Sequence, residues 1–199
     1  MRLMRGRRIG SVVAVVAVIG SVLSPVVASA VTDNTTITAT IASVISVTTS
    51  DTVGISITPT SGGSLSSSSD TVTVNTNSTA GYTLTVADSD ANTNLVSGGN
   101  NIAASANTTG SPAALANNTW GFAIAGAPFD TSYSAESNVA GSTTKWAGMP
   151  ATGSPFTLKD TSSTATDDAT TVWYAVEATS SQPNGAYVDT VTYTATAKS

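Results

Sequence analysis

The chain has 199 residues, with no cysteine, no histidine, and 7 basic against 12 acidic side chains. The missing cysteine and histidine exclude disulfide bonds, thiol nucleophiles and the commonest general base. The few basic residues exclude the positively charged surface by which a protein binds nucleic acid or an anionic membrane.

The segment 1–30, MRLMRGRRIGSVVAVVAVIGSVLSPVVASA, has the layout of an export signal. Four arginines precede a long apolar run, and the closing Ala-Ser-Ala places small residues where signal peptidase cleaves. A retained membrane helix is the alternative, since the run is about long enough to span a bilayer, but Pro25 interrupts it. We therefore expect a signal-peptide helix over 1–30, cleavage before Val31, and an acidic extracellular protein without a membrane contact after cleavage.

The mature chain, 31–199, alternates apolar and polar residues with a period of two. The alternation marks seven segments: 37–47, 53–57, 72–74, 82–86, 120–124, 172–176 and 187–197. This period is typical of strands half-buried on a sheet, and turn-forming clusters such as SGGS and QPNG separate the segments. The sequence predicts an all-β fold, a single antiparallel β-sandwich of jelly-roll or Ig-like type, with one domain over 31–199.

The first of these segments, ITATIASVISV at 37–47, follows the expected cleavage site after a short polar lead. It is either the first strand of its own domain or a strand donated to a neighbouring subunit, as in fibre proteins. We expect an internal first strand, because strands that follow one another in the chain usually lie side by side. The alternative predicts polymers in solution.

The segment DSDANTN, 88–94, follows the strand expected over 82–86. Oxygen-bearing side chains stand at alternate positions, as in a calcium loop: Asp88, Asp90, Asn92 and Asn94. The glycine and the glutamate that complete such a loop are missing, because Thr93 and Gly99 hold their places. We expect a surface turn in which Asp and Asn side chains bond their own backbone, with weak calcium binding as the alternative and no other cofactor.

Paired carboxylates are the remaining route to catalysis in a chain without histidine or cysteine. The candidates are Asp88 with Asp90, Asp167 with Asp168, and Glu136. Their spacing defines no cleft, and neighbouring acidic residues in polar loops are usually solvated. We therefore expect that the protein is not an enzyme.

The aromatic residues divide between the core and an expected binding loop. Tyr82 and Trp120 stand in phase with apolar neighbours, which predicts that both face the core, whereas Trp173 is out of phase. The segment 126–155 lacks periodicity and predicts a long excursion between strands, where binding residues usually lie. Small and turn-forming residues flank Trp146, so we expect it to be exposed as a ligand-contact residue, together with Tyr133 and Phe129.

Three motifs follow one another in the mature chain: NSTAGYTLTV, NNTWGFAI and NGAYVDTVTYTATA. Their order resembles small secreted proteins of bacteria with reduced genomes, the Saccharibacteria type, over nearly all of the mature chain. An early GYTLTV strand with a late VTYTATA strand is more distantly similar to the WxL-type surface domains of Gram-positive bacteria. That resemblance implies a secreted β-sandwich held noncovalently on the wall through peptidoglycan. The Trp-x-Leu signature is missing, since the tryptophans stand in WGF, WAG and WYA, so no binding residue is carried over.

We therefore expect a non-enzymatic, secreted, Thr/Ser-rich β-sandwich protein of the bacterial cell surface or cell wall, with an adhesin-like or envelope role. Its expected partner is a cell-wall glycan or a surface protein. Two alternatives stay open. The first is a structural subunit of a fibre or surface layer that self-associates by edge-strand pairing. The second is a carbohydrate-binding module that uses Trp146 and the segment 126–155.

Overall fold

The computed structural model describes residues 30–199, so the signal-peptide helix expected over 1–30 lies outside the described residues except for Ala30. The chain divides into two units, of which the first ends at Thr40 and the second covers residues 41–199. The described part of the first unit is exposed and contains no strand. Residues 30–199 contain strands but no helix, and therefore no helix that could cross a membrane.

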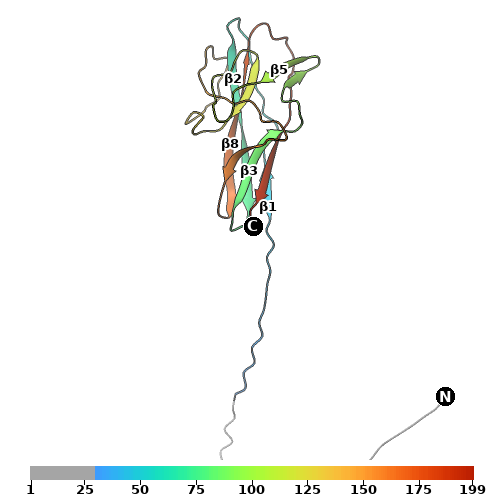
Figure 1. Ribbon diagram of the computed structural model, residues 1–199, viewed down its shortest axis with the longest axis vertical. Helices are drawn as coiled ribbons and strands as arrows, with labels where there is room; N and C mark the ends of the chain where they lie inside the picture. Colours follow the sequence, from blue (N-terminus) through green and yellow to red (C-terminus); the bar gives the residue numbers. More distant parts are fainter. Residues whose placement is uncertain (1–29) are drawn as a thin grey trace, which may run out of the picture. The chain divides into compact units, whose positions relative to one another are not determined.

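The strands of the second unit form two sheets (Figure 1). The larger sheet has the order β1–β2–β8–β6–β5–β4, and all its neighbours are antiparallel except the parallel pair β5 and β6. Its strands are β1 (Ile45–Thr48), β2 (Ser64–Thr76), β4 (Leu95–Ser97), β5 (Asn100–Ala104), β6 (Thr119–Ala123) and β8 (Ala165–Ala178). The smaller sheet is antiparallel, with the order β7 (Phe156–Asp160), β3 (Tyr82–Asp88) and β9 (Val191–Ala197). The all-β prediction is confirmed for the described residues.

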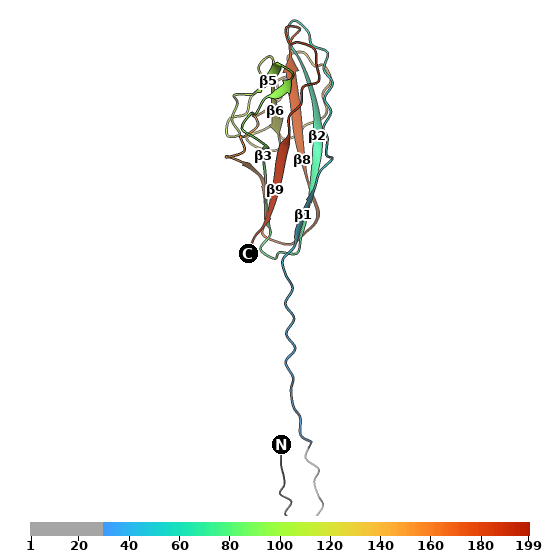
Figure 2. The same ribbon diagram turned by 90° about the vertical axis from the view of Figure 1, so that its right-hand side faces the viewer.

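The two sheets lie in different layers, with β3 and β9 in one and β1, β2 and β8 in the other (Figure 2). Side chains from both sheets share one buried core. In β3, Tyr82, Leu84 and Val86 are fully buried while the threonines between them are partly exposed, as the period of two predicts. Trp120 is buried as well, so the predictions that Tyr82 and Trp120 face the core are confirmed.

An ion pair connects the two sheets. The Lys159 ammonium on β7 lies 2.5 Å from the Asp168 carboxylate on β8, and the Tyr82 hydroxyl on β3 donates a hydrogen bond to the other Asp168 oxygen at 2.8 Å. The hydrogen bond from Lys159 lowers the pKa of Asp168 below its ordinary value. Burial, together with the adjacent Asp168, raises the pKa of Tyr82, which therefore stays a protonated donor.

The strand expected over 37–47 is wrong for most of its length. Only Ile45–Thr48 forms β1, whereas the side chains of Ile37 and Ile41 are 90% and 86% exposed. A side chain takes the place of a partner strand next to β1, because the Asn77 amide accepts from the Val44 backbone N–H and donates to the Ala42 carbonyl. In the described structure no strand pairs with 37–41, so apolar alternation alone did not produce a strand there.

The serine-rich start of β2 is buried, which its composition does not indicate. Ser66 and Ser67 accept hydrogen bonds from the backbone N–H groups of Asn138 and Glu136, each at 2.9 Å. Leu65 and Val139 exchange two backbone bonds at 2.8 Å. Residues 136–139 therefore cover this part of β2, and the serine hydroxyls supply the acceptors that a buried backbone requires.

The segment 126–155 is an irregular connection between β6 and β7, as predicted. Isolated bridges tie it to the larger sheet, Phe122 of β6 with Ala147 and Leu65 of β2 with Val139, and a third joins Trp146 to Ala113 in the connection between β5 and β6. These bridges place the middle of the segment against β6 rather than in solvent.

Candidate functional site

The expectation that Trp146 is an exposed ligand-contact residue is wrong. Its side chain is fully buried. Its ring N–H donates to the Thr144 hydroxyl at 2.9 Å, and its backbone pairs with Ala113. The small neighbours that suggested an open loop instead allow close packing, because the Gly121 backbone leaves no room for a Cβ beside the Ala147 carbonyl. A buried Trp146 offers no face to a sugar ring.

Tyr133 and Phe129, the other predicted contact residues, also contribute to the packing of the segment. The Tyr133 ring lies against Trp146 with centroids 5.1 Å apart, and its hydroxyl donates to the Lys145 carbonyl at 2.5 Å. Phe129 is buried and packs against the rings of Phe122 and Phe156. The structure therefore buries Trp146 and Phe129 in the core and packs the partly buried Tyr133 against it.

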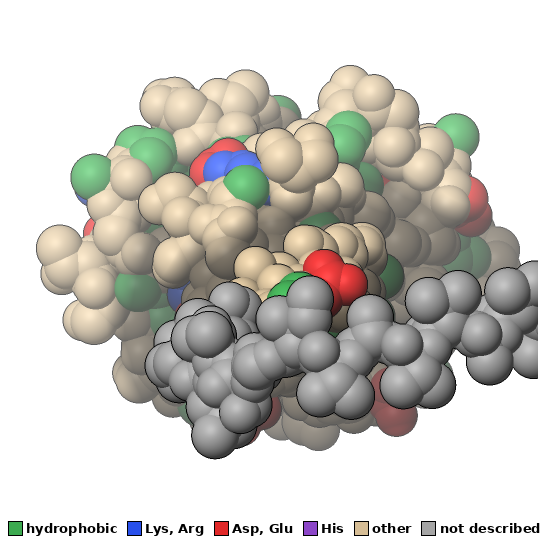
Figure 3. Space-filling view, turned by 90° about the horizontal axis from the view of Figure 1, so that it is seen from below, with side chains coloured by type: hydrophobic (Ala, Val, Ile, Leu, Met, Phe, Trp, Pro, Cys, Tyr) green, Lys and Arg blue, Asp and Glu red, His purple; other side chains and the backbone are tan. Residues whose placement is uncertain are grey.

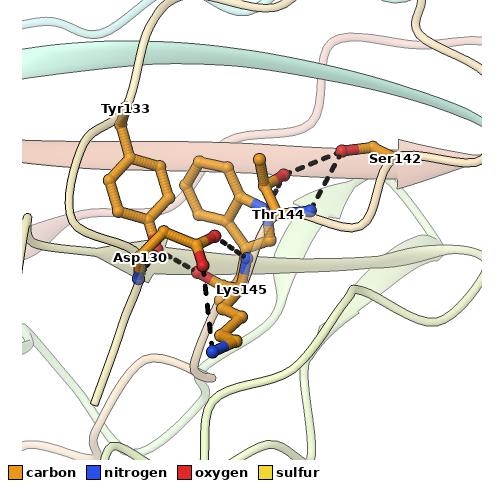
Figure 4. A network of polar contacts seen from close by, with 6 residues as sticks. Asp130, Tyr133, Ser142, Thr144 and Lys145 are labelled. Atoms are coloured by element: carbon orange, nitrogen blue, oxygen red, sulfur yellow. Dashed lines mark hydrogen bonds and ion pairs between the residues drawn. The ribbon is translucent and has the colours of Figure 1, made fainter. Parts of the chain in front are cut away.

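A shallow hollow of about 480 Å³ marks the outer side of the same segment. Asp130 accepts the Lys145 backbone N–H at 2.9 Å, and its other oxygen lies 3.9 Å from the Lys145 ammonium (Figure 4). The polar groups of this hollow therefore bond one another, as a loop-stabilising network does.

The segment 88–94 forms the turn that the sequence predicts. The Asp88 carboxylate accepts the Asp90 backbone N–H at 3.0 Å, and Asp90 in turn accepts the Asn92 N–H at 2.6 Å. Asn92 accepts the Asn94 N–H at 3.4 Å. Each side-chain oxygen thus bonds the backbone two residues on, which is the Asx-turn geometry. Among the described residues no three acidic side chains gather in a geometry that could hold a metal ion.

A second hollow of the described surface is an apolar groove of about 800 Å³. It lies between the extended segment 47–57 and the segment 185–193 that leads into β9, with its floor on both sheets. Its apolar and aromatic lining includes Val53, Ile55, Ile57, Trp120, Tyr187 and Tyr193. Apolar, aromatic concave surfaces of this size are where proteins usually bind ligands or peptide segments.

A small polar network lines the same groove. The buried Asp70 carboxylate accepts the Ser50 hydroxyl at 2.6 Å and the Ser50 backbone N–H at 2.9 Å. The Tyr174 and Tyr193 hydroxyls lie 2.5 Å apart. Burial is the main cause that raises the pKa of each tyrosine, with Asp70 adding to it. Both hydroxyls therefore stay protonated and are available as hydrogen-bond donors in the groove wall.

Sequence reasoning also missed a buried carboxyl group on β8. Glu177 is buried beneath Gly63, and burial raises the pKa of its carboxyl above the ordinary value, with the charge of Glu136 adding to the effect. Asp167 and Asp168, by contrast, point to different environments: Asp167 is exposed, whereas Asp168 is engaged by Lys159. Asp167 and Asp168 therefore do not act together at one site.

The face seen in Figure 3 carries mostly uncharged polar side chains and backbone, with single hydrophobic side chains and few charges between them. Such a surface agrees with the low charge of the sequence. No protein-family model, no curated protein and no solved structure matches this chain. The groove and the exposed segment that precedes β1 are therefore the features from which a function can be argued.

Proposed function

We propose that the protein is a secreted, non-enzymatic component of the bacterial cell surface or cell wall, whose two sheets form a β-sandwich of jelly-roll or Ig-like type. The proposal rests on the apolar groove. This groove joins an apolar, aromatic binding surface to a few polar groups, the Asp70 carboxylate and the Tyr174 and Tyr193 hydroxyls, which is the usual composition of a ligand site. Export through the segment 1–30 and a wall glycan or surface protein as partner are parts of the same proposal.

Cosedimentation with wall sacculi tests it. The purified chain beginning at Val31 is spun with and without sacculi, beside two variants that each add one negative charge. Ile55→Asp places the charge in the groove, where Ile55 is half-buried, and Ser154→Asp places it at an exposed turn outside the groove. We expect wild type and Ser154→Asp to pellet with sacculi and Ile55→Asp to stay in solution. Wild type that stays soluble with sacculi contradicts the proposal.

A second candidate, a structural subunit that assembles by strand donation, is favoured by the exposed apolar residues before β1. Ile37, Ile41 and Val44 are all exposed in an extended segment. The outer edge of β9 is unpaired in the described structure, and the groove opens beside the start of that strand. An apolar strand from one copy, seated against a second copy, would cover both surfaces at once.

Sedimentation velocity without sacculi distinguishes this candidate from the first. We expect the double variant Ile37→Asp/Ile41→Asp to remain monomeric if wild type forms polymers. Thr38→Asp/Thr40→Asp is the matched control, because its charges lie in the same exposed segment on the alternate positions. A wild type that is monomeric at every concentration tested removes strand donation and leaves the wall-associated protein. The carbohydrate-binding alternative has lost its contact residue, since Trp146 is buried.

A further inference from the structure

Two aspartates meet where β3 ends and β9 begins. Asp88 pairs with Val191 across the two strands, and the Ser89 N–H donates to the Thr190 carbonyl at 3.0 Å, so the antiparallel register continues beyond the end of β3 and ahead of the start of β9. Asp189 stands two residues before Val191 and therefore on the same face of the pair as Asp88. The two carboxyl groups are close enough to share a hydrogen bond when one of them is protonated.

Each of these carboxyl groups holds a buried oxygen without a partner. Asp88 is fully buried; its Oδ1 accepts the Asp90 N–H, and its Oδ2 has no hydrogen-bond partner. Asp189 uses Oδ1 to accept the Thr190 N–H at 2.7 Å, and its Oδ2 is buried and unpartnered too. Unpaired buried carboxylate oxygens are costly, and native structures normally satisfy them with a proton donor, a cation or water.

The described chain supplies no positive charge to this pair. Its basic side chains are three lysines, and each pairs with another aspartate: Lys145 with Asp130, Lys159 with Asp168 and Lys198 with Asp160. Two carboxylates facing one another without a counter-charge repel. The neutralising charge must therefore come from outside residues 30–199.

We propose that Asp88 and Asp189 bind a divalent cation, Ca²⁺, at the junction of β3 and β9. Calcium accepts carboxylate oxygens in flexible geometry and completes its shell with main-chain oxygens and water. Because only two carboxylates contribute, the site belongs to the weak class of extracellular modules, with a Kd on the order of 10⁻⁴–10⁻³ M. This assignment goes beyond the proposed surface function and stands independently of it.

This site differs from the one that the DSDANTN pattern suggests. Asp90 and Asn92 each use a side-chain oxygen to accept a backbone N–H within the turn. The second ligand comes instead from Asp189, which also lines the groove. A bound cation would hold the start of β9 against the end of β3 and thereby fix one wall of the groove.

A proton is the competing occupant. Burial raises the pKa of Asp189 to about 6, and the carboxyl groups of Asp88 and Asp90 that face it add to the shift. One shared proton would reduce the negative charge of the pair without removing it, and it would be held mainly below that pH. The test is therefore made at pH 7.5, above this pKa, where a proton no longer competes effectively with a cation for the site.

Thermal unfolding of the purified protein is measured in chelator, in 5 mM CaCl₂ and in NaCl of equal ionic strength. For wild type we expect calcium to raise Tm by about 2–9 °C over both controls, the range that follows from the expected affinity. In Asp189→Asn we expect a higher Tm than wild type in chelator, because the repulsion is gone, and no further rise with calcium. Asp167→Asn is the matched control: it removes one exposed carboxylate at a position with φ 50, which asparagine tolerates.

Isothermal titration with CaCl₂ gives the second readout, with one site expected for wild type and Asp167→Asn and none for Asp189→Asn. A wild-type Tm that is equal in calcium and chelator overturns the proposal. Equal loss of the calcium effect in Asp167→Asn and Asp189→Asn overturns it as well, because that result means charge screening rather than a site.

Discussion

Replacing Trp146 with alanine distinguishes a packing role from a ligand-contact role for this side chain. Trp146 is fully buried, contacts Tyr133, and satisfies its ring N–H with Thr144. A buried tryptophan side chain removes about 150–250 Å² from water, and truncation of such a residue to alanine costs about 3–5 kcal/mol, since the cavity only partly collapses. At about 2–4 °C per kcal/mol for a domain of this size, Tm should fall by about 6–20 °C.

Urea denaturation followed by circular dichroism measures this loss as a change of midpoint at constant slope. Trp173→Ala is the matched control, because Trp173 is half-buried on β8 and stacks on the other side of Tyr133 with centroids 6.4 Å apart. We expect its loss to be no more than about half that of Trp146→Ala. A Trp146→Ala variant whose free energy of unfolding stays within about 1 kcal/mol of wild type would refute the reasoning, since only an exposed side chain is removed so cheaply.

Two further changes test the packing of the 126–155 segment and the connection between the sheets. Gly148→Ala should lower the free energy of unfolding, measured in urea, by about 1–3 kcal/mol or more, because its Cβ would overlap the Ser105 carbonyl oxygen. Gly153→Ala is the control, since Gly153 has open space around it, and it should change the free energy of unfolding by less than about 0.5 kcal/mol. Asp168→Asn should cost about 1 kcal/mol at pH 7 by weakening the contacts with Lys159 and Tyr82. The pKa of Asp168 is lower in the folded protein than its ordinary value of 3.8, so this stabilisation is complete above pH 3.8 and is lost as the pH falls further. The Tm values of wild type and Asp168→Asn should therefore converge at low pH.

Apolar alternation predicted strands that carry the core, but it also predicted a strand over 53–57, where the structure has none. Tyr82, Leu84 and Val86 in β3, and Tyr193 in β9, show in sequence the same period that their burial shows in the structure. The strands β4, β5 and β7 escaped prediction because they are short and carry few apolar residues at alternate positions, whereas the equally short β6 carries Trp120 and Phe122 in phase. The alternation at 37–47 is regular, yet the strand that it predicts does not form over 37–41, because the described structure has no neighbouring strand there.

Burial of small and isolated residues depends on what covers them, and composition carries no signal for it. The serines of β2 are buried by residues 136–139, a contact that joins segments about 70 positions apart. Trp146 is buried because glycines at 121 and 148 let backbones approach closely around it. The local sequence WAGMPATG has the composition of an exposed turn, and only the tertiary contacts decide otherwise.

The sequence did indicate that these acidic residues are buried, because each occupies an inward position of the apolar alternation. Asp88 continues the inward positions of Tyr82, Leu84 and Val86, and Asp189 lies between Tyr187 and Val191 on the same side of its segment. Asp70 likewise precedes Val72 and Val74 at an interval of two. A carboxylate at an inward position is either paired or neutralised. In the structure Asp70 is bonded by Ser50, whereas Asp88 and Asp189 face one another with free oxygens. That difference is why the cation is assigned to Asp88 and Asp189, and not to Asp70.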